Sequence, residues 1–287
     1  MDYRDQVVIV TGASSGIGRV TARAFAERGA IVVAVARREG LLQELITECR
    51  TSSPRSHFIA GDLGERAFAE RVVDETAERF GRIDVLINNA AITKHKQIYH
   101  VCAEEAERVM DVNFRSCLWT TFAAIPVMLR AGGGTLVNVS SFAGWVVPPR
   151  ETIYGASKAA MSAFTAGLWN DLQGSNIHAA LVIPGAIDTE IWDKEDEPVA
   201  FTGAKAPPEV VADAIFEAIE KRRREITVPK RKPDLWAASF LRFAFPGILL
   251  RGMRRMDPVP TTVVERARER ARRGLRLGDS EGADTEC

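Results

Sequence analysis

The stretch VVIVTGASSGIG, residues 7–18, decides the fold expected for this chain. Its first four residues form the apolar run of a buried strand, glycines follow at positions 12, 16 and 18, and a helical pattern begins directly afterwards. Glycines in a strand-to-helix turn let the backbone approach a pyrophosphate, which the helix N-terminus favours as an anion. A glycine-rich turn without a ligand is the alternative, and the position at the first strand–helix junction disfavours it. The predicted cofactor contacts in this loop are Gly12, Ser14, Ser15, Gly16, Ile17 and Gly18.

Further apolar runs with the same character follow along the chain, and helical patterns fill the gaps between them. The runs cover residues 31–36, 57–61, 84–90, 134–140, 177–183 and 225–229. The clearest helical patterns cover residues 17–29, 65–80 and 104–130, each with glycine at or just after its end. Strands that alternate with helices predict an α/β fold, a doubly wound (Rossmann) parallel sheet of seven strands. We expect it to form one domain over residues 1–230.

The charge of the chain is unevenly distributed although its formal sum is zero. Residues 1–220 carry 21 Lys and Arg against 29 Asp and Glu, a net of −8; residues 221–276 carry 17 against 5, a net of +12; the last eleven residues add −4. We therefore distinguish a basic and apolar C-terminal extension, residues 231–276, from an acidic tail, residues 277–287, predicted to be disordered. A basic extension suits an acidic partner such as a membrane surface or nucleic acid. Nucleic acid is disfavoured because bulky apolar residues accompany the charges and no binding module is recognisable.

Residues 235–255 of the extension are too interrupted, by Arg242 and Pro246, to form a spanning helix. One interpretation is an interfacial amphipathic element that makes a peripheral membrane contact. Its aromatic residues would enter lipid while its arginines meet headgroups. The alternative is that the extension folds over the substrate entrance or a neighbouring subunit. The four cysteines have no metal-site spacing and no leader precedes the first strand, so we expect a cytoplasmic protein without a metal.

The end of the second strand indicates which dinucleotide binds. An acidic residue at this position hydrogen-bonds the ribose hydroxyls and repels a 2′-phosphate, but here Ala36 is followed by Arg37 and Arg38. A guanidinium binds phosphate in a bidentate manner. The sequence therefore predicts NADP(H), with Arg37 as the main phosphate ligand and Ser14 or Arg38 assisting. After the third strand, Asp62 and Leu63 are expected beside the adenine.

The sequence IYGASK, residues 153–158, places Tyr154 and Lys158 one helical turn apart on the same helix face. A phenol with an unperturbed pKa near 10 is a weak base at neutral pH, and a neighbouring ammonium is expected to lower that pKa. Tyr154 is then the candidate acid and base in the transfer of a hydride to or from a carbonyl group. Taken alone, the pair also fits a tyrosine and a lysine on a solvated helix.

Together these motifs resemble the short-chain dehydrogenase/reductase family over about residues 6–229. The resemblance rests on TGASSGIG, Asp62, NNAA at 88–91, Asn113 in MDVNF, Ser141 in NVSSFAG, Tyr154 with Lys158, and Pro184-Gly185 followed by Thr189. The family usually has NNAG, so Ala91 departs from its pattern. The order and spacing of the motifs make the match specific.

The resemblance implies roles that the residues alone do not. Ser141 would hold the substrate oxygen, and Lys158 would also bond the nicotinamide ribose. The Asn113 side chain would hold a water that links Lys158 to solvent. Further cofactor contacts would be Asn89, Ala90, Tyr154, Lys158, Pro184, Gly185, Ile187 and Thr189. A homo-oligomer, dimer or tetramer, is expected through the helices at 104–130 and 153–173.

Residues 145–147 and residues 191–192 would border the substrate if the resemblance holds. Residues 190–206 have the composition of a mobile lid. The predicted pocket residues are Ser141, Trp145, Val146, Tyr154, Ile191 and Trp192. Their apolar character favours an NADP(H)-dependent oxidoreductase acting on an apolar carbonyl/alcohol pair. An NAD-linked alcohol dehydrogenase and an NADP-binding regulator without turnover are the alternatives. A pure binding protein needs neither Ser141 nor the Tyr154 hydroxyl, which disfavours the regulator.

Overall fold

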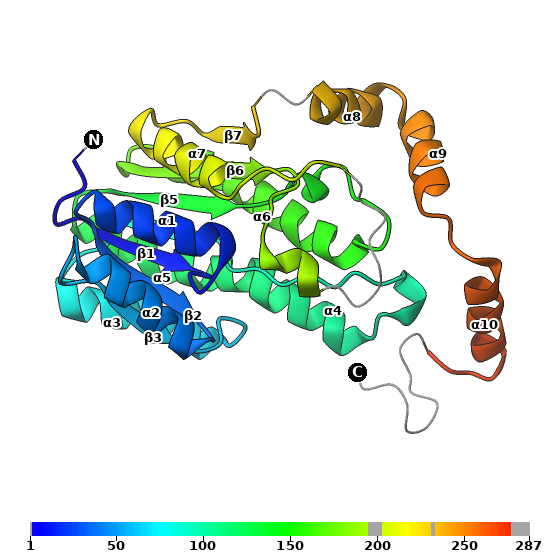
Figure 1. Cartoon of the computed structure of the whole chain (residues 1–287), viewed down its shortest axis with the longest axis horizontal. Helices are drawn as coiled ribbons and strands as arrows, with labels where there is room; N and C mark the ends of the chain where they lie inside the picture. Colours follow the sequence, from blue (N-terminus) through cyan, green and yellow to red (C-terminus); the bar gives the residue numbers. More distant parts are fainter. Residues whose placement is uncertain (1, 195–202, 231–232, 277–287) are drawn as a thin grey trace.

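A parallel sheet of seven strands forms the centre of the computed structural model, which describes residues 2–194, 203–230 and 233–276 (Figure 1). The strand order is β3-β2-β1-β4-β5-β6-β7 and every neighbouring pair is parallel. The strands are β1 Val7–Thr11, β2 Ile31–Ala36, β3 His57–Ala60, β4 Val85–Asn88, β5 Gly134–Val139, β6 Ile177–Pro184 and β7 Glu225–Val228. The predicted doubly wound sheet is therefore confirmed.

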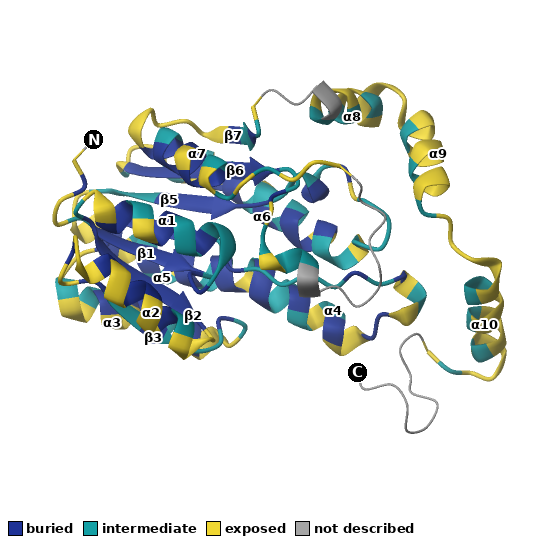
Figure 2. Cartoon of the chain, viewed as in Figure 1, coloured by how far each residue is buried: buried dark blue, intermediate teal, exposed yellow. Residues whose placement is uncertain are grey.

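Helices cover both faces of the sheet because side chains of a buried strand point alternately to either side. They are α1 Gly16–Glu27, α2 Glu39–Arg50, α3 Arg66–Phe80, α4 Ala103–Met110, α5 Ser116–Arg130, α6 Thr152–Asp171 and α7 Glu209–Glu220. Val8 and Val10 pack in the core beneath α1, α2 and α7, whereas Val7 and Ile9 pack in the core with α3, α5 and α6. Figure 2 shows the sheet as a buried layer between these helices.

The strand order reverses between β1 and β4, and this switch point positions the site. In such sheets the carboxyl ends of the strands open into a crevice at the reversal. Thr11 closes the floor of that crevice: its hydroxyl donates to the Ile87 carbonyl at 3.2 Å and accepts the N–H groups of Asn89 and Ala90 at 2.9 and 3.0 Å. The end of β1 is thereby fastened to the end of β4.

Two predicted elements have different boundaries in the structure. The pattern at 104–130 predicted one helix, but a π-helical turn, η2 Asp111–Arg115, separates α4 from α5. The run at 84–90 extends beyond β4, so that Asn89 and Ala90 leave the strand and enter the loop above it. Short 3₁₀ turns complete the body, η1 Ile98–His100, η3 Phe142–Gly144 and η4 Glu190–Lys194.

The C-terminal extension forms an arm of three helices beside the body (Figure 1). They are α8 Pro233–Ala244, α9 Pro246–Met256 and α10 Thr261–Arg272. Pro246 begins α9, whereas Arg242 lies inside α8. Among the residues that the structure describes, no helix is long and apolar enough to cross a bilayer. The tail predicted to be disordered, 277–287, and positions 195–202 of the predicted lid lie outside the described residues.

Candidate active site

A cavity of about 730 Å³ opens along the carboxyl edge of the sheet, between the glycine loop and the start of α6. Loops after β1, β2, β3, β4, β5 and β6 all contribute to its wall. The predicted cofactor residues that line it are Gly12, Ser14, Ser15, Gly16, Ile17, Arg37, Arg38, Asp62, Leu63, Asn89, Ala90, Tyr154, Lys158, Pro184, Gly185, Ile187 and Thr189. One continuous space therefore joins the arginines to the tyrosine and lysine, and its lining fits a dinucleotide laid along the sheet edge.

The glycine loop needs its glycines for two different reasons. Gly12 and Gly16 have φ of +67° and +53°, a backbone region that residues with a Cβ rarely adopt. A Cβ on Gly18 would lie 2.3 Å from the Gly12 carbonyl oxygen, so Gly18 lets the first turn of α1 pack under the loop. Gly18 was predicted as a cofactor contact, but it is absent from the cavity wall and supports the loop from behind.

Arg38 is the arginine that the structure ties to the glycine loop. Its guanidinium donates to the Ser14 hydroxyl at 3.1 and 3.2 Å and to the Ser15 hydroxyl at 2.6 Å. It also forms an ion pair with Glu190 at 2.9 Å, across the cavity. Arg37 is exposed at the same end of the cavity. This end is thus positively charged and suited to an anionic group.

Asp62 lines the cavity at the position predicted for the adenine side. Its carboxylate accepts the Gly64 N–H at 2.9 Å and pairs with Arg108 of α4. Burial alone would raise the pKa of Asp62, but the hydrogen bonds from Gly64 and Arg108 outweigh it and lower that pKa. Asp62 is consequently a charged fixture that fastens the β3 loop to α4.

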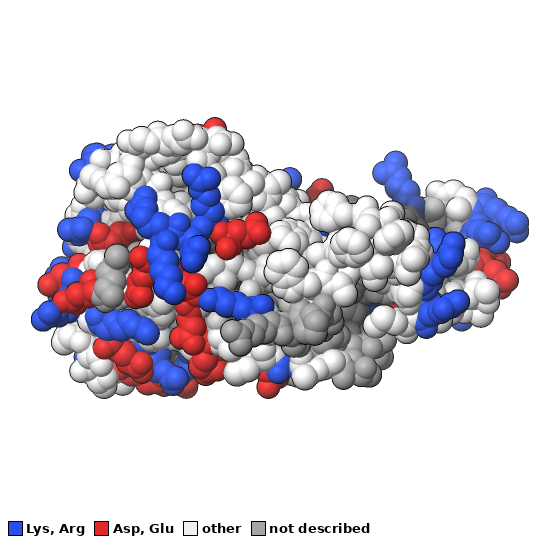
Figure 3. Space-filling model, turned by 90° about the horizontal axis from the view of Figure 1, so that it is seen from above, with Lys and Arg blue, Asp and Glu red and all other residues white. Residues whose placement is uncertain are grey.

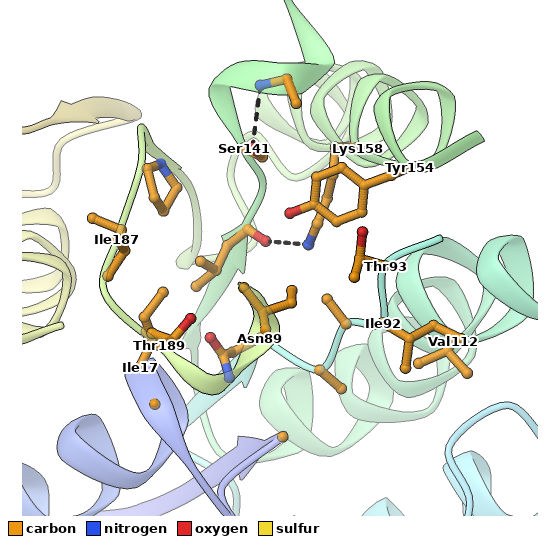
Figure 4. A pocket seen from close by; sticks show the side chains of 18 of the residues that line it. Ile17, Asn89, Ile92, Thr93, Val112, Ser141, Tyr154, Lys158, Ile187 and Thr189 are labelled. Carbon is orange, nitrogen blue, oxygen red and sulfur yellow. Dashed lines mark hydrogen bonds between the residues drawn. The ribbon is translucent and has the colours of Figure 1, made fainter. Parts of the chain in front are cut away.

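Tyr154 and Lys158 both face the cavity from the first turns of α6 (Figure 4). Lys158 is only 2% exposed, and its ammonium donates to the Val139 carbonyl at 2.9 Å. The Lys158 Nζ lies 5.9 Å from the centroid of the Tyr154 ring. Burial lowers the pKa of Lys158 to about 8, because the charged form is poorly solvated there.

The pKa of Tyr154 differs from the expectation drawn from the sequence. Lys158 was expected to lower it, yet in the protein alone it is raised, first by burial and then by the charge of Glu151. The Ser141 side chain acts in the opposite direction, as a hydrogen-bond partner that lowers this pKa. Lys158 does not offset these effects, because its ammonium donates to the Val139 carbonyl and lies 5.9 Å from the centroid of the Tyr154 ring. Tyr154 is therefore firmly protonated before a cofactor binds.

Two serines at the end of β5 have separate tasks. Ser141 begins η3, where its hydroxyl accepts the Ala143 N–H at 3.1 Å beside Tyr154. The other serine, Ser140, faces α6. Its hydroxyl donates to the Lys158 carbonyl at 2.9 Å and lies 2.8 Å from the Ser162 hydroxyl. Ser140 thus anchors the helix that carries the tyrosine and lysine.

The structure gives the Asn113 side chain a different task from the expected one. Asn113 lies fully buried in the π turn η2. Its amide accepts the Ile92 N–H at 2.8 Å, donates to the Ile92 carbonyl at 2.9 Å and donates to the Ser157 hydroxyl at 3.0 Å. The side chain was expected to hold a water beside Lys158, but these bonds use both of its N–H groups. Asn113 instead joins the β4 loop to α6.

The substrate half of the cavity contains most of the predicted residues. Val146, Ile191 and Trp192 line it together with Ser141, and the Trp192 indole donates to the Ile187 carbonyl at 2.6 Å. Trp145 was predicted there but borders a separate groove with Trp169 and Phe243. The η3 turn points Val146 into the cavity and Trp145 away from it, because neighbouring residues of a tight turn face different sides.

Further lining residues were not anticipated from the sequence: Lys94, Pro148, Glu151 and Leu235. Glu151 precedes Tyr154 by three residues, and that spacing could have identified it as a neighbour on one helix face. Leu235 comes from α8, and no local pattern relates it to the site. Within residues 2–194, 203–230 and 233–276, no three His, Cys, Asp or Glu side chains are grouped as a metal site would require.

Comparisons with known proteins agree with this arrangement. Residues 6–200 match the family model described as short chain dehydrogenase. An uncharacterized oxidoreductase YxnA of Bacillus subtilis is 34% identical, covering 78% of this chain and 65% of that protein. The 3-oxoacyl-[acyl-carrier-protein] reductase FabG of Thermotoga maritima is 33% identical, covering 75% and 91%. The 11-beta-hydroxysteroid dehydrogenase 1A of Arabidopsis thaliana is 38% identical, but the match spans 65% of this chain and 53% of that protein.

Among solved structures, a short-chain dehydrogenase from Sphingobium yanoikuyae in complex with NADPH has a TM-score of 0.73 and 27% identity. That match covers 96% of this chain and 99% of the other. The similarity therefore extends beyond the sheet into the C-terminal helices.

Proposed function

The chain belongs to the short-chain dehydrogenase family of oxidoreductases, and on that premise we propose that it reduces apolar carbonyl compounds with NADPH, using Tyr154 as acid and base. One observation carries the proposal. A single cavity joins the arginines after β2 to Ser141, Tyr154 and Lys158. A cofactor bound along it would bring its nicotinamide beside the phenol.

The preference for NADPH over NADH is supported by the end of β2. Ala36 occupies the position where an acidic residue would repel a 2′-phosphate, and the exposed Arg37 follows it in the cavity wall. Arg38 adds positive charge but is already engaged with the glycine loop. The NADPH in the Sphingobium enzyme is consistent with this proposal. An NAD-linked alcohol dehydrogenase remains the alternative that a cofactor titration must distinguish.

The chemistry follows from the positions of three side chains. Bound NADPH supplies the hydride to the carbonyl carbon. The Tyr154 hydroxyl transfers its proton to the carbonyl oxygen as negative charge develops there, and the Ser141 hydroxyl donates a hydrogen bond to the same oxygen. The Lys158 ammonium then stabilises the Tyr154 phenolate until solvent returns the proton. Because burial and Glu151 raise the pKa of Tyr154, the resting enzyme holds the proton that reduction consumes.

The substrate class is inferred from the cavity wall near Tyr154. Val146, Pro148 and Trp192 present an apolar surface, and Leu235 closes it from the C-terminal arm. Such a wall favours apolar or aromatic ketones and aldehydes over highly polar ones. The named relatives act on two different substrates, a hydroxysteroid and an oxoacyl carrier protein, so the relatives do not indicate one substrate for this chain.

The proposal is tested with purified protein by following NADPH and NADH oxidation against ketones and aldehydes of graded size and polarity. We expect NADPH to be preferred and kcat/KM to rise with substrate hydrophobicity. Equal or tighter binding of NADH would overturn the cofactor assignment. Tight NADPH binding without turnover on any compound would favour the non-catalytic regulator instead.

We also propose that the protein self-associates through α5 and α6. Phe122 and Leu129 on α5 are 59% and 51% exposed, which is unusual for large apolar side chains. Phe122 meets Phe164 of α6 edge-on, so the exposed surface continues across both helices. Light scattering should show a dimer or tetramer, and Phe122→Asp should shift it toward monomer. A monomeric wild-type protein would refute this proposal.

Exposed aromatic and basic side chains of α8 and α9 support a peripheral membrane contact. Trp236, Phe240 and Phe243 are 75%, 65% and 84% exposed, and arginines at positions 242, 251, 254 and 255 accompany them. Figure 3 shows an uncharged surface on this side of the molecule with Lys and Arg side chains to both sides of it. Flotation with anionic vesicles should recover the protein, and Phe240→Ser with Phe243→Ser should abolish recovery. The cytoplasmic location stays a prediction.

A further inference from the structure

The C-terminal arm reaches the active site through Leu235. This side chain of α8 lines the same cavity as Tyr154. It also lies against Gly185 at the end of β6, where an added Cβ would come 3.4 Å from Leu235 Cδ1. The arm therefore contributes an apolar wall close to the place proposed for the nicotinamide.

A second contact joins the far end of α9 to the segment before α6. Asp257 follows α9, and its carboxylate accepts two hydrogen bonds from Arg150, from Nε at 2.6 Å and from Nη2 at 2.8 Å. The two side chains are only 17% and 10% exposed, Arg150 and Asp257 respectively. A planar two-point pair with little solvent is strong, and removing one partner leaves a buried charge behind.

Arg150 lies just before the first turn of α6, which carries Tyr154. Its carbonyl accepts the Lys96 N–H at 3.2 Å, and the next residue, Glu151, lines the cavity. The Glu151 carboxylate lies 3.5 Å from the His95 ring nitrogen, and its backbone carbonyl accepts the Gly155 N–H at 2.7 Å in the turn that carries Tyr154. The position of Arg150 is thus coupled through Glu151 to the start of α6.

The rest of the arm has little support from the body. No residue of α9 or α10 is buried, and Figure 2 shows both helices as largely exposed. Helices that bury so little apolar surface gain little stability from packing. The Arg150–Asp257 pair is a contact between the arm and the body that is well shielded from solvent.

We propose that the arm is a wall of the substrate pocket, latched to the catalytic helix by Arg150 and Asp257, and that Leu235 determines specificity for bulky apolar substrates. This inference rests on the proposed function for its substrate class. The latch keeps Leu235 at the cavity. Without it α8 is free to move away, so bulky substrates lose contact area whereas small ones and NADPH do not.

The latch is tested in the full-length protein without reference to turnover. Trypsin cleaves after arginine, and Arg251, Arg254 and Arg255 of α9 are exposed. Cleavage there reports local opening. We expect Asp257→Asn to accelerate it by about tenfold and Asp257→Glu to restore part of the protection. The matched control is Glu269→Gln. Glu269 is an exposed carboxylate of the arm that pairs with Arg273, one turn further along the same helix. Equal rates for wild type and Asp257→Asn would overturn the latch.

The pocket wall is tested by calorimetric binding of a bulky and a small apolar ketone to the enzyme loaded with NADP⁺. We expect Leu235→Ala and Asp257→Asn to raise the Kd of the bulky ketone by about fivefold and to change that of the small one by less than about twofold. Leu235→Ala should leave the trypsin rate unchanged. An unchanged Kd, or no ketone binding by wild type, would overturn the role of Leu235. Ketone binding without turnover would instead contradict only the proposed function.

Discussion

The two halves of the cavity are built in different ways. The cofactor half is made by the ends of central strands and the first residues after them. Thr11 fastens β1 to β4, and the glycines bring the loop close to the helix. The substrate half is assembled from η3, η4 and α8, which are far apart in the sequence. The first half follows from the fold, whereas the second depends on individual side chains.

The largest expected effect on stability concerns Lys158, which lies where the two halves meet. Burial lowers the pKa of Lys158 from 10.5 to about 8. Between these pH values the unfolded chain holds a proton that the folded protein lacks, so the free energy of unfolding rises with pH. Relative to Lys158→Met, wild type should gain about 3 kcal/mol between pH 7 and 10.5. Denaturant titrations across this range measure it, and a flat or falling difference would contradict the burial of a charged Lys158.

A second experiment removes the ion pairs that hold the segment after β4, which contains the cavity-lining Lys94. Glu105 accepts hydrogen bonds from Lys94 at 2.9 Å and Lys96 at 2.6 Å and from the Cys102 N–H, and these outweigh burial and lower its pKa to about 2. Glu105→Gln should destabilise the protein by about 2 kcal/mol at pH 7. The difference should shrink as the pH falls below about 4.5 toward 2, because the carboxylate becomes protonated. Glu104→Gln, at an exposed neighbour, is the control and should have little effect.

In the cofactor half, a comparison of Arg37 and Arg38 identifies the residue that binds the 2′-phosphate. Arg37→Gln should raise the Kd of NADPH by about tenfold and leave that of NADH within about twofold, since only the 2′-phosphate is affected. Arg38→Gln should weaken both cofactors, because Arg38 positions the Ser14 and Ser15 hydroxyls. Fluorescence titrations decide between them. If Arg38→Gln selectively lost NADPH binding and Arg37→Gln bound both cofactors like wild type, Arg38 would be the phosphate ligand.

The smallest effect separates two neighbouring tryptophans of the predicted pocket. Trp192→Phe should raise KM for bulky ketones by about threefold, since Trp192 lines the cavity and is fixed by the Ile187 carbonyl. Trp145→Phe should leave KM unchanged within error, because Trp145 borders the other groove. If Trp145→Phe had the larger effect, the assignment of the substrate half would be wrong.

The fold and the cofactor half could be predicted because their signals are local. A parallel strand buried on both faces reads as one continuous apolar run, and the residue after it is delivered to the cavity by the strand itself. Asp62, Arg37 and Arg38 were predicted in this way, and all three line the cavity. Gly18 was predicted among the cofactor contacts but packs behind the loop, because the sequence does not distinguish a glycine needed for close packing from one that a ligand approaches.

The remaining features depend on contacts that the sequence pattern does not encode. The π turn that redirects the Asn113 amide has no periodic signature within the helical pattern around it. The raised pKa of Tyr154 reflects burial by the whole site and the charge of Glu151. Leu235 and Asp257 reach the site from the end of the chain, where only the three-dimensional path of the arm relates them to Tyr154.

The role of Tyr154 as acid and base is tested most directly by measuring cofactor binding and turnover side by side in Tyr154→Phe, with Tyr99→Phe as the matched control outside the cavity. Tyr154→Phe should bind NADPH within about twofold of wild type and lose about a thousandfold in kcat, because only the transferred proton is removed. Tyr99→Phe should retain both properties. Turnover in Tyr154→Phe above about a tenth of the wild-type rate would show that another group supplies the proton and would contradict the central claim.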